Sequence, residues 1–193
     1  MHSIACAYTT SECEYVERAV ALASTSVELD SDHLTHSLVD DAFYILLKGF
    51  HRSVRTGAAT LAVIPLLNTL ADAIRVRVRP ALQRLLATAG GAAVDNRAYL
   101  VAANSLRRAA YNTDRLRNVV SDAFAEHYPS LLPMAGVALN DLDAISSAFE
   151  EGAAAEMDAL AATLEPTTWL LLEFEPSEYR ILHAAAAAAG GDA

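Results

Sequence analysis

The fold class is decided by residues 34–48, which read Leu-Thr-His-Ser-Leu-Val-Asp-Asp-Ala-Phe-Tyr-Ile-Leu-Leu-Lys. Within and just beyond this stretch, apolar side chains recur three or four residues apart, at Val39, Phe43, Leu46, Phe50 and Val54. That spacing stacks them on one face of a helix. We therefore predict an amphipathic helix over residues 35–56 whose apolar face belongs to the core.

The ends of this predicted helix carry suitable polar residues. Thr35 or Ser37 can cap the first turn by accepting backbone N–H bonds, and Asp40 and Asp41 follow near the positive end of the helix dipole. Gly57 is suited to the position just after the helix. The two aspartates are adjacent, so their side chains diverge and do not form an acid–base pair.

Composition favours helices throughout the chain. Alanine, the best helix former, supplies roughly one residue in five, while only 8 Gly and 6 Pro interrupt the 193 residues. The 53% hydrophobic content is enough to bury a core. We predict an all-α protein, in which residues 1–90, residues 91–179 and a low-complexity tail at 180–193 form separate segments.

Two shorter helical regions are expected in the first segment. A capping box, Ser11-x-x-Glu14, predicts a helix over residues 11–24 with Tyr15, Ala19 and Leu22 on its apolar stripe. In residues 58–86, Pro65 and Pro80 should kink or break the chain. The alternation in residues 75–79 is typical of a strand, but no second alternating run exists to pair with it, so we predict helix there.

Two long helices are expected in the second segment, over residues 96–128, capped by Asp95, and residues 134–164. The later one carries Met134, Leu142, Ile145 and Phe149 on its apolar stripe. At 1.5 Å per residue each would reach roughly 45 Å. Long antiparallel helices joined by the short turn at residues 129–133 predict an elongated helical bundle, or rod.

The charge of the chain is acidic overall and unevenly distributed. A net charge of −10 argues against nucleic-acid binding, because cations supply most of that affinity. Residues 75–118 carry nine Arg against two Asp, whereas residues 141–178 carry ten carboxylates and no Lys or Arg. These stretches are either helices that pack with complementary flanks or two separately solvated faces.

No pattern in the sequence predicts catalysis, a cofactor or a metal. His33 and His36 lack converging partners, Ser105, Ser146 and Ser147 lack a neighbouring His, and no glycine-rich phosphate loop occurs. Cys6 and Cys13 do not make a disulfide framework, which fits a reducing compartment. The most apolar window, residues 58–67, is half a bilayer span, and no signal-peptide pattern opens the chain.

The only candidate anion-binding surface is the arginine cluster from Arg75 to Arg84, with Arg107, Arg108, Arg115 and Arg117. Arg75, Arg77 and Arg79 begin a run that extends to Arg84, and it could touch an anionic ligand, anionic lipid or an acidic helix. A charged solvent face is the simpler interpretation. Trp169, beside three leucines, is either a core residue or a binding hot spot.

Four segments, in order, resemble one family. The Val-Asp-Asp-Ala-Phe-Tyr-Ile run at residues 39–45 is similar to a Met-Val-Asp-Asp-Val-Phe-Tyr-Ile stretch in that family, and residues 18–22 to its Lys-Ala-Val-Ala-Leu. Residues 139–149 resemble its Leu-Ser-Asp-Leu-Ala-x-Val-Ser-x-x-Phe, and residues 173–179 loosely resemble an acidic segment. The family is subunit 4 of the conserved oligomeric Golgi complex, a vesicle tether, and the resemblance covers residues 12–179.

The resemblance implies a non-catalytic scaffold built as a rod of helical bundles, of the type found in multisubunit tethering complexes. It implies an internal part of the C-terminal half of a longer protein on the cytosolic face of the Golgi membrane, attached peripherally. The implied partners are the other tether subunits, vesicle-fusion proteins and Rab proteins, in intra-Golgi retrograde transport. The alternative is an unrelated all-α binding module that uses the arginines for an anionic ligand or lipid.

Overall fold

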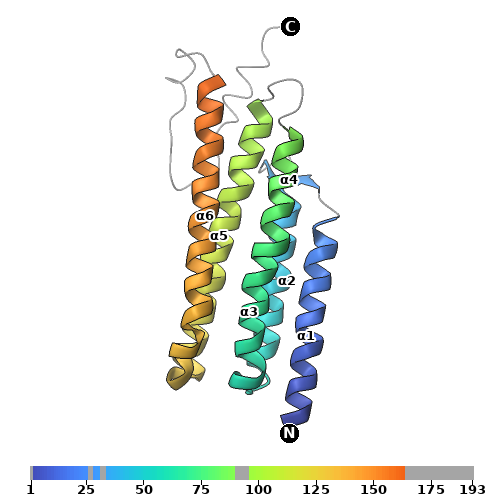
Figure 1. The fold of residues 1–193 in the computed structure, drawn as a ribbon, viewed down its shortest axis with the longest axis vertical. Helices are drawn as coiled ribbons and strands as arrows, with labels where there is room; N and C mark the ends of the chain where they lie inside the picture. Colours follow the sequence, from blue (N-terminus) through green and yellow to red (C-terminus); the bar gives the residue numbers. More distant parts are fainter. Residues whose placement is uncertain (1, 26–27, 31–33, 90–95, 164–193) are drawn as a thin grey trace.

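The all-α prediction is confirmed by a computed structural model, which describes residues 2–25, 28–30, 34–89 and 96–163 (Figure 1). Its helices are α1 (His2–Ala23), α2 (Ser37–Val54), α3 (Ile64–Ala73), α4 (Arg79–Ala89), α5 (Asn96–His127) and α6 (Leu132–Thr163). Shorter elements are the π-helices η1 (Ala59–Val63) and η2 (Ile74–Val78), the 3-10 helix η3 (Pro129–Leu131), and the two-residue strands β1 (Leu29–Asp30) and β2 (Thr35–His36).

The helices run up and down along the long axis of the molecule (Figure 1). Helix α2 packs on α5, α5 on α6, α6 on α3 and α3 back on α2, which closes a four-helix ring. Helix α1 contacts α2, α3 and the two π-helices, and it lies on the outside of the ring. Antiparallel neighbours with short connections are the expected topology for long helices.

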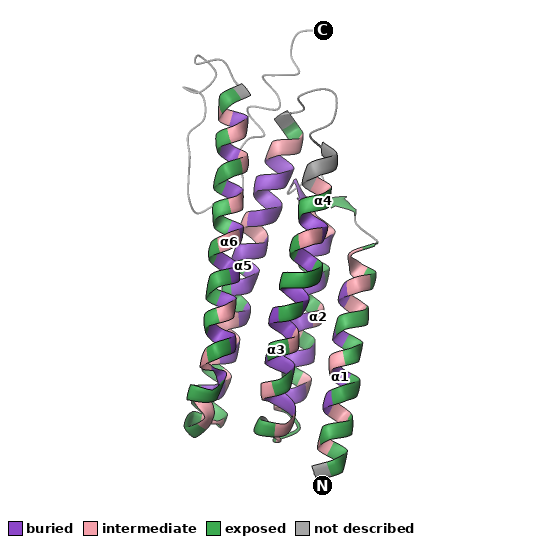
Figure 2. Cartoon of the chain, viewed as in Figure 1, coloured by how far each residue is buried: buried purple, intermediate pink, exposed green. Residues whose placement is uncertain are grey.

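The core fills the ring along most of its length (Figure 2). Phe43, Phe50, Phe124 and Phe149 are its largest fully buried side chains. All seven residues expected in the core are buried: Val39, Phe43, Leu46, Phe50, Leu142, Ile145 and Phe149. A second, smaller cluster joins α5 and α6 near Leu100 and Leu160. Met134, which the stripe on α6 included, is 54% exposed, and Ala135 takes the buried position beside it.

The prediction for α1 is wrong in two respects. The helix already covers residues 2–10, so Ser11 lies in its middle and caps nothing. Its buried side is formed by Thr9, Glu12, Val16 and Val20 rather than by the stripe through Tyr15 and Leu22. The buried Thr9 hydroxyl lies 2.7 Å from the Leu61 carbonyl oxygen and 2.8 Å from that of Ala5, so a contact remote in sequence satisfies its hydrogen-bonding capacity.

The predicted caps of α2 are also wrong. His36 occupies the N-cap position with no side-chain cap, and Ser37 is the first helical residue. The Ser37 hydroxyl instead accepts a bond from the Glu28 N–H, next to the short β1–β2 ladder. Strand pairing therefore holds the start of this helix. Gly57 follows the helix with φ +68°, a left-handed conformation that glycine adopts without steric cost.

The chain does not break at Pro65 or Pro80. The chain stays helical from η1 through α4, and each proline lies two residues after a π-helical segment. Proline removes one backbone donor and crowds the carbonyl four residues earlier, and a wider π turn relieves that crowding. The alternating residues 75–79 are helical, as predicted, and most of them lie in η2.

Adjacent residues on α2 provide a test of the buried face. Phe43 is 2% exposed, whereas Tyr44 is 63% exposed. We expect Phe43→Ala to lower the free energy of unfolding by about 3–5 kcal/mol and Tyr44→Ala by about 0.5 kcal/mol or less. Urea unfolding followed by circular dichroism measures both. Equal losses for the two variants would contradict this orientation of α2.

Candidate functional site

The three arginines proposed as an interaction surface have different surroundings. Arg75 is engaged: its guanidinium lies 3.0 Å from a carboxylate oxygen of Asp72 and 3.1 Å from one of Asp141. Arg77 lines a surface groove, and Arg79 is exposed outside it. Trp169, the fourth residue of the predicted surface, lies outside the described residues. The cluster therefore divides into a structural arginine and a part that faces solvent.

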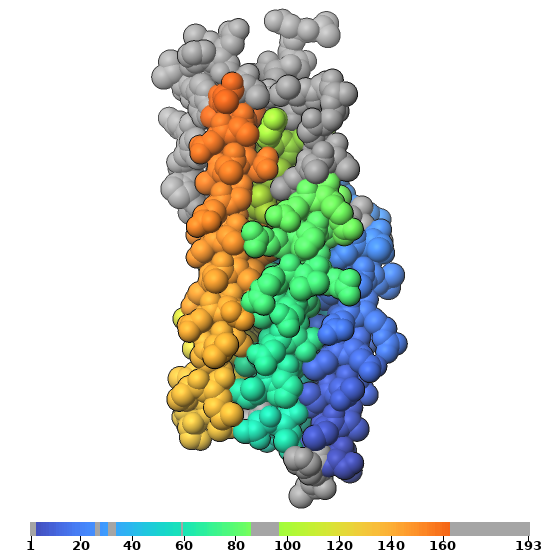
Figure 3. Space-filling model, in the orientation of Figure 1, coloured from blue at the N-terminus to red at the C-terminus, as the bar shows by residue number. Residues whose placement is uncertain are grey.

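The groove lies between the C-terminal end of α1 and the η2–α4 segment, on the face shown in Figure 3. Its volume is about 610 Å³. Helix α1 and the turn after it contribute Ala21, Ser24 and Thr25, and the opposite wall contains Val76, Arg77, Pro80, Gln83 and Arg84. Among the residues that the structure describes, neither Arg77 nor Arg84 forms an ion pair. We call this feature the basic groove.

Other arginines of the basic stretch do meet carboxylates across helix boundaries. Arg117 on α5 lies 2.9 Å from Asp143 on α6, and Arg75 reaches Asp141 on the same helix. The stretches of opposite charge therefore pack with partly complementary flanks. Arg108 on α5 lies 2.9 Å from Asp40, so this helix-start acid ties α2 to α5. Each pair is partly exposed and contributes at most about 1 kcal/mol.

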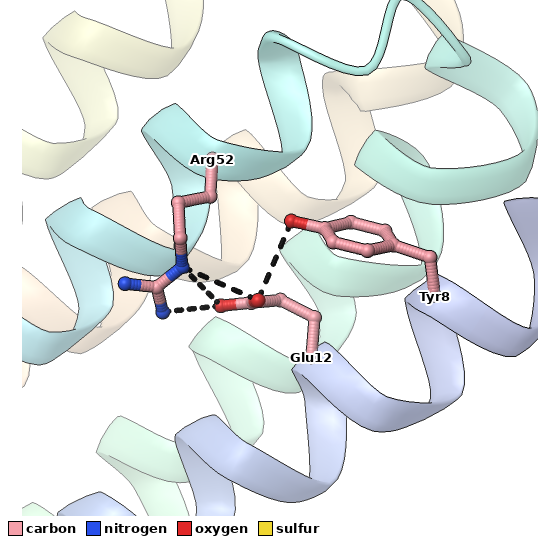
Figure 4. A network of polar contacts seen from close by, with 3 residues as sticks. All are labelled: Tyr8, Glu12 and Arg52. Carbon is pink, nitrogen blue, oxygen red and sulfur yellow. Dashed lines mark hydrogen bonds and ion pairs between the residues drawn. The ribbon is translucent and has the colours of Figure 1, made fainter.

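A second polar site joins α1 to α2 (Figure 4). The Arg52 guanidinium donates to both carboxylate oxygens of Glu12, and the Tyr8 hydroxyl lies 3.3 Å from one of them. The guanidinium carbon also lies 5.0 Å from the centre of the Tyr15 ring, which suits a cation–π contact. The Glu12 side chain is only 9% exposed, so Arg52 neutralises a nearly buried charge.

The electrostatics of this site stabilise the ion pair. The hydrogen bond to Glu12 raises the pKa of Arg52, so the guanidinium stays charged. Burial, followed by the negative charge of Glu12, raises the pKa of Tyr8, so the phenol stays protonated. Helices α1 and α2 approach closely here, because a Cβ at Gly49 would lie 2.8 Å from Val16. The arrangement holds two helices together.

The described residues place little reactive chemistry near either site. No three His, Cys, Asp or Glu residues in the described part of the chain come close enough to hold a metal ion. Burial raises the pKa of the Cys13 thiol, which favours the less nucleophilic protonated form. Of the two histidines considered as metal ligands, His33 lies outside the described ranges. No helix in those ranges has the length and apolar content needed to cross a membrane.

The chain was compared with protein families, curated proteins and solved structures. No protein-family model, curated protein or solved structure matches the chain.

Sequence reasoning located the arginines but not the sites. The basic groove needs residues 21–25 beside residues 76–84, and the Glu12–Arg52 pair joins positions 40 residues apart. No local pattern encodes either contact. The one available signal was the placement of Glu12 and Thr9 at helical spacing from Val16, which makes a face with polar residues at one end.

Removing one partner of the α1–α2 ion pair tests its role. Arg52→Ala leaves the nearly buried Glu12 carboxylate unpaired, so we expect the free energy of unfolding to fall by about 1–2 kcal/mol. This loss is smaller than for a fully buried pair, because Arg52 is 41% exposed and solvent screens its charge. Glu12→Gln should cost less, since Arg52 can turn to water. The control is Arg18→Ala, whose pair with Glu14 is exposed. An equal effect of Arg52→Ala and Arg18→Ala on the free energy of unfolding would contradict a stabilising role for the Glu12–Arg52 ion pair.

A pH dependence is expected from His36. Burial lowers the pKa of its imidazole from the ordinary 6.5, so the unfolded chain takes up the proton more readily than the folded one. This contribution to stability is present above about pH 6.5 and is lost as the pH falls through the lower, folded pKa. Urea unfolding at about pH 7 and pH 5 should show a smaller loss for His36→Gln than for the parent chain. His51→Gln, at an exposed position, is the control and should leave the loss unchanged.

Proposed function

We propose that this chain is a non-catalytic helical scaffold of a Golgi vesicle-tethering complex, with the rod-like bundle architecture of such complexes. The proposal is supported by the resemblance of four ordered segments to subunit 4 of the conserved oligomeric Golgi complex. The observation that carries it is the place of the two best-matched motifs. Val39 and Phe43 of the first, and Leu142, Ile145 and Phe149 of the second, are core residues of a long helical bundle.

The chemistry of the polar residues supports a scaffold rather than an enzyme. Asp40 of the Val-Asp-Asp motif pairs with Arg108, and the amide of Asn112 lies 3.4 Å from the same carboxylate. Glu12 is neutralised by Arg52. A general acid or base needs a carboxylate that can exchange a proton with a substrate, and both of these are held by arginines of neighbouring helices. Their role in the proposal is to fix helix positions.

The proposed partners are the other subunits of the tether, together with vesicle-fusion and Rab proteins. The chain would act in intra-Golgi retrograde transport on the cytosolic face of the Golgi, as a peripheral component attached through the complex. The exposed faces of the helices supply the contact surfaces, in the way that amphipathic helices recognise one another.

A second candidate function rests on the basic groove. Arg77 and Arg84 have no carboxylate partner among the described residues, which is the arrangement expected of an anion-binding surface. An unrelated all-α module that binds an anionic ligand or lipid would use the same two side chains.

Affinity capture separates the two functions. We expect the tagged full chain, expressed in cells that contain the tether, to co-purify its other subunits, and to show no salt-sensitive binding to phosphatidylserine liposomes. Capture of no tether subunit, together with liposome binding that weakens as salt increases, would overturn the scaffold proposal and favour the second function. Phe43→Ala serves as a control, because loss of the core should abolish specific capture.

A further inference from the structure

The basic groove combines apolar surface with positive charge. Its lining includes the apolar side chains of Ala21, Val76 and Pro80, and Val76 is 57% exposed. Arg77 and Arg84 also line it and are seven residues apart, a separation of about 10 Å along a helix, with Pro80 between them in the chain. Two residues seven apart lie on nearly the same face. A ligand that fills the groove therefore meets both apolar surface and two positive charges.

We propose that the basic groove binds an acidic amphipathic helix of a partner protein. A helix with carboxylates at positions i and i+7 would place them beside the two guanidiniums, and aliphatic residues at i+3 and i+4 would cover Pro80. Planar guanidiniums suit paired recognition of carboxylates. This inference names a partner chemistry for the proposed scaffold and rests on that proposal only for the existence of a partner.

The surroundings of the groove disfavour a compact anion such as phosphate. The Ser24 hydroxyl donates to the Val20 carbonyl at 2.8 Å, and the Thr25 hydroxyl donates to that of Leu22 at 2.7 Å. Each hydroxyl has one proton, so neither can donate a second bond to an anion.

The shape and charge of the face also disfavour a lipid surface. A concave groove receives a convex helix, whereas a bilayer is flat on this scale. Glu14 and Glu17 on α1 are exposed, and the whole chain carries a net charge of −10, which opposes approach to an anionic membrane. A short partner helix places its carboxylates only beside the two guanidiniums, whereas an extended anionic membrane surface would also face these other carboxylates.

Peptide binding to the full chain tests the proposal. The probe is a fluorescent, alanine-rich helical peptide with Glu at i and i+7 and Leu at i+3 and i+4, measured by anisotropy. We expect Arg77→Glu/Arg84→Glu to weaken binding at least about tenfold, and Arg79→Glu, on the same segment but outside the groove, to change it less than about twofold. A peptide with Lys in place of both Glu residues should restore binding to the charge-reversed chain.

Several results would overturn the assignment. These are unchanged binding after the double reversal, an equal loss with Arg79→Glu, or binding of inorganic phosphate or phosphatidylserine vesicles in place of the peptide. Binding that appears only after Glu173, Glu175 and Glu178 are changed to Gln would identify an occupant within the chain itself and refute a separate partner. Circular dichroism checks folding, and Arg77→Gln/Arg84→Gln replaces the reversal if it does not fold.

The peptide assay contains no tether subunit, so its outcome is independent of affinity capture. Peptide binding without subunit capture would leave the groove assigned and the tethering role refuted. Subunit capture without peptide binding would leave the scaffold and refute the groove.

Discussion

The structure depends on the burial of one face of α2. This helix contacts α1, α3, both π-helices and α5, and Phe43, Leu46 and Phe50 on its inner face are almost completely buried. Three fully buried side chains of this size contribute several kcal/mol, a large share of the stability of a small domain. Loss of this face would open the ring between α3 and α5.

The sequence was informative wherever one face of a helix is uniformly apolar. In α2 and α6 the spacing of apolar residues predicted the element and most of its buried face, because burial there depends mainly on the hydrophobic effect. Helix α1 departs from that pattern. At 100° per residue, the predicted stripe through Tyr15, Ala19 and Leu22 lies roughly 100° from the centre of the buried face. Its orientation is determined by remote polar partners instead.

The helical path past two prolines shows a second limit of local reasoning. Pro65 and Pro80 are 15 residues apart, and η1 and η2 begin at Ala59 and Ile74, also 15 apart. Proline rules predict a break because they assume regular α-helical turns. A π turn before each proline changes the local hydrogen-bond register, and buried residues on either side, Leu66 and Leu82 among them, hold the helix against the core.

These two departures together produce the candidate site. Because the Glu12–Arg52 pair turns the polar part of α1 inward, Tyr15 and Leu22 face solvent along the outside of the bundle. Because η2 continues the helix through residues 74–78, Val76 and Arg77 face the end of α1 instead of entering a turn. The basic groove thus lies where the apolar-stripe rule fails for α1 and the proline rule fails for α4. Functional sites are expected at such positions, because their residues are not selected for helical periodicity alone. A chain that obeyed both rules would bury Tyr15 and Leu22, break before Pro80, and have no groove between α1 and α4.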